Sequence, residues 1–384
     1  MSVADEIARA ELRALHDAGL QRQLEPSRAA PGVMIELRPG ERLINFSSND
    51  YLGLAADPRV AKALAEGASK WGSGASASRL VVGDFEPHHE LEAAVASLEG
   101  AEAALLFGSG YAANSGLFGA FVQQEDLIVS DELNHASIID GCKLSRARIE
   151  VYPHGDIEAA RRLLKLPTRR RLLVTDAVFS MDGDRAPLRD LARICADHGA
   201  MLAVDEAHSS GVTGPRGAGL CAELDVASDL RLTTLSKAFG VFGAAVSGTR
   251  AVRELLISRA RSLLFATGLP PALACAALES LKIATSPEGD ERRAKLWRNI
   301  RQFAAGLRKL GLEAREESAI FPVILGSPER AVEGALRLRE LGCLAKAIRP
   351  PTVAAGTSRL RFALSALHTE AHVDAALSAL RQIC

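Results

Sequence analysis

LRLTTLSKAFG, residues 230–240, decides how this part of the chain folds, because an apolar run ends there in hydroxyl groups, a lysine and a glycine. Lys237 stands among Leu235, Ala238 and Phe239 and far from any run of charge. Its ammonium must therefore reach water along the side chain or lose its proton. A neutral lysine is a nucleophile. The stretch predicts a strand that leads into a chemically active lysine.

The same pattern recurs between about residues 56 and 270. Each apolar run is followed by polar or glycine residues, and helical stretches separate the runs. Strands that alternate with helices predict a mainly parallel sheet, which binds its ligand at the carboxyl ends of the strands. We therefore expect the polar segments after the strands to converge. The runs are 101–110, 126–137, 146–156, 170–184 and 200–211.

Outside this region the pattern changes. Residues 3–24 predict one amphipathic helix, and a short strand follows it. After residue 270 two long helical stretches precede short strands and further helices, which predicts a compact α+β unit. The predicted fold is α/β, with a large, mainly parallel sheet of the seven-stranded type and a smaller C-terminal domain. The expected parts are 1–48 (N-terminal helix and short strand), 49–280 (large domain) and 281–384 (small domain).

Composition narrows the functional class. A chain of 384 residues buries a large core, and a net charge of −1 gives no field that attracts nucleic acid or anionic lipid. The six cysteines form no CxxC pair and no metal-binding spacing, so we expect reduced thiols and no metal site. The first residues lack the apolar core of a signal peptide, and no run reaches the ~20 apolar residues of a membrane helix. We expect a cytoplasmic enzyme.

Three side chains after predicted strands suggest the chemistry. Asp205 closes an apolar strand, where a carboxylate is costly to bury without a partner. His208 follows three residues later, and Lys237 ends another strand. Together they could hold a protonated pyridine ring, with the carboxylate at the ring nitrogen and the lysine on an aldehyde carbon. Ser180 would join His208 at a phenolic oxygen, although Asp205 alone also fits a helix cap or an ion pair.

A phosphate group would find donors nearby. The stretch 107–116, FGSGYAANSG, places glycines before a helix N-terminus, where free N–H groups favour an anion. Taken alone, it also fits a plain strand-to-helix turn. Thr234 adds a hydroxyl, and His135 fits either a ring-stacking role or a helix cap. No GxGxxG motif follows the first strand, which disfavours a nicotinamide dinucleotide.

The combination of these motifs resembles the α-oxoamine synthases. These are fold-type I enzymes that use pyridoxal 5′-phosphate (PLP) to condense an amino acid with an acyl thioester and release CO2. The resemblance spans about residues 6–380. The motifs that carry it are SSNDYLGL (47–54), GYAANSG (110–116), NHASIIDG (134–141), VFSMDGD (178–184), VDEAHSSGVTGPRGAG (204–219) and TLSKAFG (234–240).

The resemblance implies a role for each matching residue. Lys237 would bind the aldehyde carbon as a Schiff base and, once released, act as a base with a lowered pKa. Asp205 would pair with the pyridine nitrogen, and His208 and Ser180 with the phenolic oxygen. His135 would stack on the ring and take part in catalysis. The phosphate contacts would be Gly110, Tyr111, Ala112 and Thr234, with Thr267 supplied by the neighbouring subunit of a homodimer.

The tail 347–368, AIRPPTVAAGTSRLRFALSALH, is the best discriminator within the family. It favours the member that joins L-alanine to a pimeloyl thioester of coenzyme A or of a carrier protein, in biotin synthesis. Members that use glycine or serine are the alternative. Arg359 or Arg361 would grip the amino-acid carboxylate, and the family pattern favours Arg361. Further substrate contacts would be Arg22, Asn49, Arg349 and Thr352.

Two further points follow from the resemblance. A non-catalytic PLP-binding subunit is a remote alternative, and it would be expected to lack Lys237. The segment 72–83, GSGASASRLVVG, departs from the family, because Ser76 and Ala77 stand where paired glycines are frequent. That segment helps to shape the acyl channel across the dimer. The departure therefore concerns acyl specificity rather than the fold.

Overall fold

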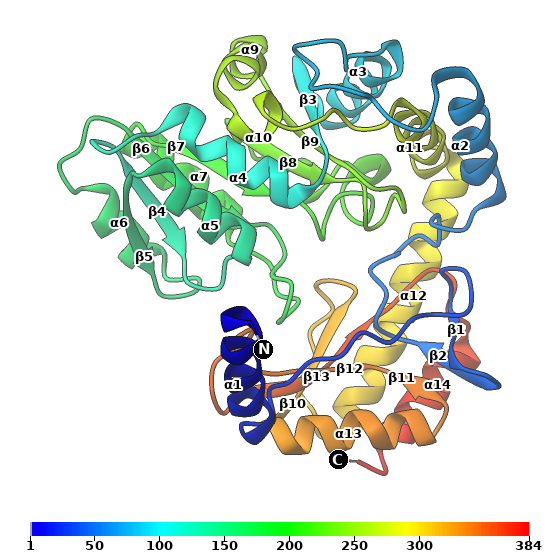
Figure 1. Ribbon diagram of the computed structural model, residues 1–384. Coiled ribbons are helices and arrows are strands. Elements are labelled where there is room, and N and C mark those ends of the chain that lie inside the picture. Colours follow the sequence, from blue (N-terminus) through cyan, green and yellow to red (C-terminus); the bar gives the residue numbers. More distant parts are fainter. Residues whose placement is uncertain (1, 384) are drawn as a thin grey trace. The chain divides into compact units, whose positions relative to one another are not determined.

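A computed structural model describes residues 2–383 and divides the chain into two compact units (Figure 1). Unit 1 gathers the chain up to Asn49, the short stretch Met181–Gly183 and the residues from Leu296 onward. Unit 2 holds Asp50–Ser180 and Asp184–Lys295. The division falls inside helix α12 (Pro287–Lys309), whereas the sequence placed a boundary near residue 280. The N-terminal segment belongs to the same unit as the C-terminal part.

Unit 2 carries a seven-stranded sheet with the order β3-β9-β8-β7-β6-β4-β5. Six strands run parallel, and β9 runs antiparallel between β3 and β8. The predicted fold class is confirmed. The sequence analysis assigned no strand to β9, whose stretch AAVSG contains only three apolar residues, all of them small. The strands are β3 (Ala103–Phe107), β4 (Leu127–Asp131), β5 (Arg148–Tyr152), β6 (Arg171–Asp176), β7 (Met201–Asp205), β8 (Leu230–Thr234) and β9 (Ala244–Gly248).

Both faces of this sheet are buried, which explains the nearly continuous apolar runs of its strands. Ile128 belongs to one core cluster and Val129 to the other, because successive side chains of a strand point to opposite faces. Helices α4 and α5 contribute to the first cluster, and α6 and α7 to the second. The helices are α2 (Pro58–Trp71), α3 (Glu86–Glu99), α4 (Gly110–Phe121), α5 (Ala136–Ser145), α6 (Ile157–Leu164), α7 (Leu188–Asp197), α8 (Leu220–Leu224), α9 (Arg250–Arg259), α10 (Arg261–Leu264) and α11 (Pro271–Ala284).

Unit 1 is built around two three-stranded sheets and an aromatic core. The strand orders are β1-β2-β11 and β10-β13-β12, so the N-terminal strands pair with a strand near the end of the chain. Phe303 of α12 packs against Phe46, Phe321 and Phe362. The remaining elements are β1 (Met34–Arg38), β2 (Glu41–Asn45), β10 (Ile320–Gly326), β11 (Cys343–Leu344), β12 (Lys346–Ile348), β13 (Ser358–Ala363), α1 (Val3–Asp17), α13 (Pro328–Glu340) and α14 (Glu370–Leu380).

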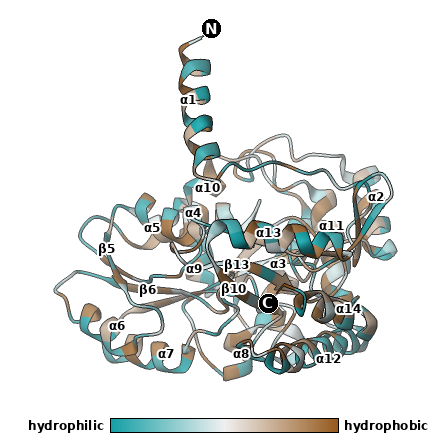
Figure 2. Cartoon of the chain, turned by 90° about the horizontal axis from the view of Figure 1, so that it is seen from below, coloured by the Kyte–Doolittle hydropathy of each residue, from teal (hydrophilic) through white to brown (hydrophobic). Residues whose placement is uncertain are grey.

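The first helix is shorter than the sequence predicted. It ends at Asp17 rather than near residue 24, because Gly19 adopts the left-handed conformation with φ of 65° and stops it. No residue of α1 is buried, and its apolar side chains, such as Ile7 and Leu12, are exposed. Hydrophobic and hydrophilic residues alternate along this helix (Figure 2). Among residues 2–383, no helix combines the length and the apolar character of a membrane span.

The packing of α4 against α5 gives a test of this core. A Cβ atom added at Gly141 of α5 would lie 2.2 Å from the Asn114 carbonyl oxygen, so Gly141→Ala forces the helix backbones apart. We expect Gly141→Ala to lower the free energy of unfolding by about 1–3 kcal/mol in urea titrations. The matched control is Gly119→Ala of α4, whose added Cβ would meet nothing nearer than 3.6 Å. It should be neutral or stabilising by up to ~1 kcal/mol, and equal losses in both variants would contradict the packing argument.

Candidate active site

Three of the predicted residues meet at the carboxyl edge of the sheet in unit 2. Strands β6, β7 and β8 are adjacent and parallel, so the segments that follow them emerge on the same side (Figure 1). Asp205 is the last residue of β7, and His208 lies in the turn that follows it. Lys237 follows β8, and its Nζ lies 2.9 Å from Nε2 of His208. Asp205 and His208 are both buried.

The Asp205 carboxylate is held by donors on both of its oxygens. Asn114 of α4 donates an amide hydrogen to Oδ2 at 2.8 Å, and the Ala207 N–H donates to Oδ1 at 2.9 Å. Asn114 also donates to Ser137 of α5 at 3.0 Å. The sequence analysis missed Asn114, although a polar residue in an otherwise apolar helix was an available signal. These bonds fix the carboxylate and offset the cost of burying it.

A second carboxyl group, that of Asp176, lies beside Asp205. Asp176 ends β6 and is the register partner of Asp205. Its Oδ2 accepts the His135 N–H at 2.7 Å, and its own N–H is donated to Asn134 Oδ1 at 2.9 Å. Burial raises the pKa of Asp176 well above its ordinary value, and the Asp205 charge acts in the same direction. The sequence analysis missed Asp176, although it closes an apolar strand just as Asp205 does.

His135 is the N-cap residue of α5. Its Nδ1 accepts the Ser137 N–H at 3.2 Å and lies 2.7 Å from the Ser137 hydroxyl. The helix-cap alternative left open by the sequence is therefore present in the structure. Partial burial lowers the pKa of His135, the Lys237 charge lowers it further, and the Asp205 charge opposes this. The imidazole is consequently neutral at neutral pH.

The start of α4 forms a cradle of donors. Ser109 caps the helix by accepting the Ala112 N–H at 3.1 Å, and the first N–H groups of any helix lack acceptors within it. A Cβ added at Gly110 would lie 3.8 Å from the Thr234 hydroxyl, so this hydroxyl faces the same turn. Tyr111 is exposed. Backbone donors, a helix dipole and a hydroxyl fit a phosphate group.

Two other predicted cofactor contacts lie in turn or loop segments of unit 2. Ser180 is half-buried and is the last residue of unit 2 before Met181–Gly183, which belongs to unit 1. Thr267 is exposed in the loop that follows α10, where its neighbour Gly268 donates its N–H to Ala77 at 2.9 Å. The sequence assigned Thr267 to the site of a neighbouring subunit, and its roles and those of Ser180 stay predictions.

The predicted substrate contacts all belong to unit 1 and form two groups. Arg361 donates to Asn49 Oδ1 at 3.2 Å. Arg22 donates to the Thr352 hydroxyl at 3.2 Å, and Arg349 donates to the Gly19 carbonyl. A hollow of about 630 Å³ is lined by Arg22, Arg349 and Thr352 and also by Arg38, Arg339 and Lys346, which makes it basic. Glu25 is in the same lining and pairs with Arg339 and Lys346.

The structure separates the two arginines of β13, which the sequence could not. Both are buried, and they lie two residues apart on one strand. Arg359 forms an ion pair with Asp182 and donates to the Met181 carbonyl at 3.3 Å. Arg361 donates to the amide oxygen of Asn49. The charge of Arg359 is thus already balanced by a carboxylate of its own unit.

A charged histidine ties together the loops that carry His135 and Ser180. His154, in the turn after β5, contacts Asp131 at 3.0 Å and Asp184 at 2.7 Å, one carboxylate at each ring nitrogen. These bonds raise the pKa of His154 to about 10, so the ring is an imidazolium at neutral pH. The sequence analysis missed this group, because neither partner is near His154 along the chain.

We expect His154→Gln to destabilise the protein in a pH-dependent way. The pKa of His154 is raised from an ordinary 6.5 to about 10, so its stabilisation is complete below pH 6.5 and is lost as the pH rises toward 10. Because the ring is a quarter exposed, solvent screening reduces the effect to about 2 kcal/mol at pH 6. Chemical denaturation of both proteins at several pH values measures the difference.

The control for this prediction is His89→Gln. His89 is more exposed and also contacts a carboxylate, that of Asp84 at 2.7 Å. Its replacement should change the free energy of unfolding much less than that of His154. A His154→Gln penalty that stays constant from pH 6 to pH 10 would contradict the ionic explanation.

Comparisons with known proteins identify the family of this chain. A family model of the class I and II aminotransferases matches residues 41–380. A serine palmitoyltransferase structure from S. paucimobilis with bound PLP and myriocin has a TM-score of 0.92 and 31% identity, covering 100% of this chain and 98% of that one. Fold and site thus define a fold-type I protein of the class I and II aminotransferases.

More similar relatives narrow the family. The 8-amino-7-oxononanoate synthase of Anaeromyxobacter dehalogenans is 54% identical over 379 residues, which is 97% of this chain and 94% of the relative. That of Geobacter sulfurreducens is 45% identical over 97% and 96% of the two chains. An 8-amino-7-oxononanoate synthase structure from Francisella tularensis has a TM-score of 0.77 and 30% identity, covering 88% of this chain and 97% of that one. This chain belongs to the 8-amino-7-oxononanoate synthase family.

Proposed function

We propose that this chain condenses L-alanine with a pimeloyl thioester of coenzyme A or of a carrier protein and releases CO2, to give 8-amino-7-oxononanoate in biotin synthesis. The observation that carries the proposal is the contact of Lys237 with His208 beside Asp205, in a chain of this family. The described residues include free thiols, four of them buried, which suits a cytoplasmic enzyme.

The donor set of unit 2 fits PLP. Lys237 would bind its aldehyde carbon and Asp205 its ring nitrogen, while His208 and Ser180 would contact the phenolic oxygen. The phosphate would be held by Thr234 and the first turn of α4, at Gly110, Tyr111 and Ala112, with Thr267 from a second subunit. When bound, PLP supplies an electron sink for the bonds at the α-carbon of the amino acid.

The residues around the cofactor supply the proton transfer, the orientation and the charge that the reaction needs. Lys237, released as an amine, takes the proton from the alanine α-carbon onto Nζ, and His208 orients Nζ from 2.9 Å. Asp205, fixed by Asn114, keeps a negative charge for the ring nitrogen. His135, neutral through its lowered pKa, is free to cover the ring without adding a charge.

The substrate contacts come from unit 1. Arg361, which Asn49 orients, binds the alanine carboxylate. Arg359 holds the loop at Asp182. Arg22, Arg349 and Thr352 line the basic hollow and contact the remainder of the substrate.

We propose a homodimer as the active unit. Exposed apolar side chains gather in two neighbouring segments of unit 2, at Leu80, Val81 and Val82 and at Phe265. The two segments are joined by the bond from the Gly268 N–H to Ala77. An exposed patch of this kind is typical of a subunit interface, and its position beside Thr267 suits the proposed contribution of that residue across the dimer.

A direct assay tests the reaction. The PLP-loaded protein is mixed with pimeloyl-coenzyme A and L-alanine, glycine or L-serine, and the products are identified by mass spectrometry. We expect 8-amino-7-oxononanoate from alanine, at a rate at least tenfold above the rate with the other two. Turnover of glycine or serine alone would assign a different amino acid to the site, and no turnover with any of them would contradict the proposal.

The two arginines of β13 give a matched pair of variants. Lysine cannot reproduce the bidentate contact of arginine with a carboxylate, so we expect Arg361→Lys to raise the KM for alanine about 10- to 100-fold. Arg359→Lys should lower the melting temperature, because Arg359 pairs with Asp182, and should leave that KM within about threefold. Release of free coenzyme A measures the KM for alanine in both variants. A large rise of this KM in Arg359→Lys and a small one in Arg361→Lys would assign the carboxylate contact to Arg359.

A further inference from the structure

A line of three polar side chains in unit 2 leads from the buried turn 50–57 to Lys237. The phenolic oxygen of Tyr51 lies 2.6 Å from Nδ1 of His208, and Nε2 of His208 lies 2.9 Å from Nζ of Lys237. Tyr51 is fully buried, and His208 is nearly so. We propose that Tyr51 is a positioning residue whose hydroxyl pairs with Nδ1 of His208 in either tautomer, and so lets His208 accept at Lys237 and donate at the cofactor.

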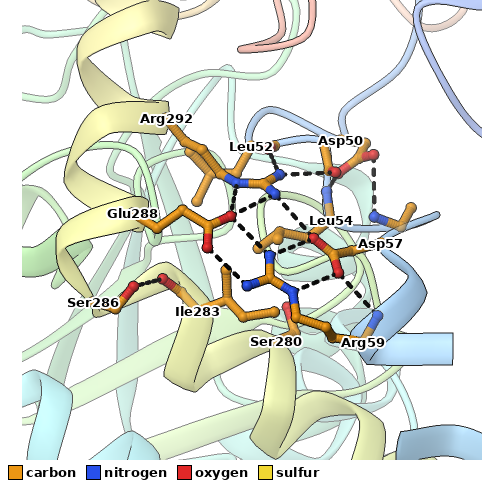
Figure 3. Close-up of polar contacts among 12 residues, drawn as sticks. Asp50, Leu52, Leu54, Asp57, Arg59, Ser280, Ile283, Ser286, Glu288 and Arg292 are labelled. Carbon is orange, nitrogen blue, oxygen red and sulfur yellow. Dashed lines mark hydrogen bonds and ion pairs between the residues drawn. The ribbon is translucent and has the colours of Figure 1, made fainter. Parts of the chain in front are cut away.

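The backbone next to Tyr51 is fixed by hydrogen bonds to charged side chains (Figure 3). The Asp50 carboxylate accepts the N–H groups of Leu54 and Ala55 at 2.8 and 3.2 Å. Arg292 of α12 donates to the carbonyl oxygens of Leu52 and Gly53 at 2.9 and 3.2 Å.

Arg292 is itself anchored in the same network (Figure 3). It contacts Asp57 at 2.9 Å and Glu288 at 2.8 Å, and Arg59 bridges the same two carboxylates at 2.8 Å each. The turn that carries Tyr51 is therefore held by hydrogen bonds to Asp50 and Arg292, and two carboxylates hold Arg292 in place. The phenolic oxygen of Tyr51 presents a fixed partner to Nδ1 of His208.

A neutral imidazole has one N–H group and one lone pair, so its two partners must play opposite roles. A charged lysine only donates. Facing Lys237 in that state, Nε2 of His208 accepts, and Nδ1 then carries the proton and donates to the Tyr51 oxygen. Facing the phenolic oxygen of PLP, Nε2 must donate instead. Nδ1 then accepts, and the Tyr51 hydroxyl becomes the donor.

A tyrosine hydroxyl can fill both roles, whereas a phenylalanine ring can fill neither. Without the hydroxyl, the hydrogen bond between residue 51 and Nδ1 of the buried His208 is lost in both tautomers. Packing would be kept, but the hydrogen bond from His208 to the cofactor would weaken. This role of Tyr51 toward Lys237 needs only the contacts above, and its role toward PLP rests on the proposed function.

The first test is nitrogen NMR of the full chain labelled with 15N-histidine, before and after PLP is added. His208→Gln identifies the His208 signals among those of the nine histidines. We expect wild-type His208 to carry its proton on Nδ1 without PLP and on Nε2 with it. A wild-type protein that shows the same tautomer in both states would overturn the proposal, whether or not any variant folds.

The second test compares Tyr51→Phe with Tyr152→Phe, which removes the hydroxyl of another buried tyrosine, on β5. In Tyr51→Phe the tautomer signals should average, and the midpoint of the visible absorbance of bound PLP against pH should rise by about one unit. The rise is expected because the weaker hydrogen bond from His208 stabilises the anionic phenolic oxygen of PLP less. That oxygen then keeps its proton to a higher pH. Tyr152→Phe should leave both readouts unchanged.

Two outcomes would separate the failure of this inference from that of the proposed function. If Tyr51→Phe behaves like Tyr152→Phe in both readouts, Tyr51 has only a packing role and the inference is wrong. If PLP gives no visible band with the wild-type protein, the proposed function fails. In that case the NMR experiment on the cofactor-free chain still tests the contact of Tyr51 with His208, because a proton on Nδ1 of His208 is expected there.

Discussion

The parallel pairing of β6, β7 and β8 is the constraint on which the candidate site depends. Parallel strands end on the same side of a sheet, so residues that directly follow them must share a small volume. Asp176 and Asp205 are register partners in neighbouring strands, and Lys237 follows the third. The backbone hydrogen bonds of the sheet thereby bring these titratable groups together.

Burying several polar groups close together costs free energy. The structure offsets this cost in a different way for each group. Asp205 receives an amide hydrogen and a backbone N–H, whereas burial and the Asp205 charge raise the pKa of the neighbouring Asp176. His154 takes the opposite course and stays charged between two carboxylates. Titratable groups that lie close together therefore have different surroundings, which is how active sites keep acids and bases apart.

The two units divide the candidate residues by chemistry. Unit 2 holds the cluster around Asp205, and unit 1 holds the buried arginines of β13 and the basic hollow. The loop after β6 passes from one unit to the other and back, since Ser180 and Asp184 belong to unit 2 while Met181–Gly183 belongs to unit 1. Its tip is bound by Arg359 and its return by His154. A residue in this loop is thus constrained from both sides.

The sequence by itself determined the parallel sheet and the residues after its strands, because both follow from local patterns of apolar runs and polar ends. It also indicated Asp205, His208 and Lys237 and the family motifs that contain them. Only the tertiary structure decided the strand β9 and the contacts of Arg359 with Asp182 and of Arg361 with Asn49. Tyr51 and His208 are 157 residues apart, and Asp182 and Arg359 are 177 apart. No local pattern encodes such contacts, since they arise when separate elements pack.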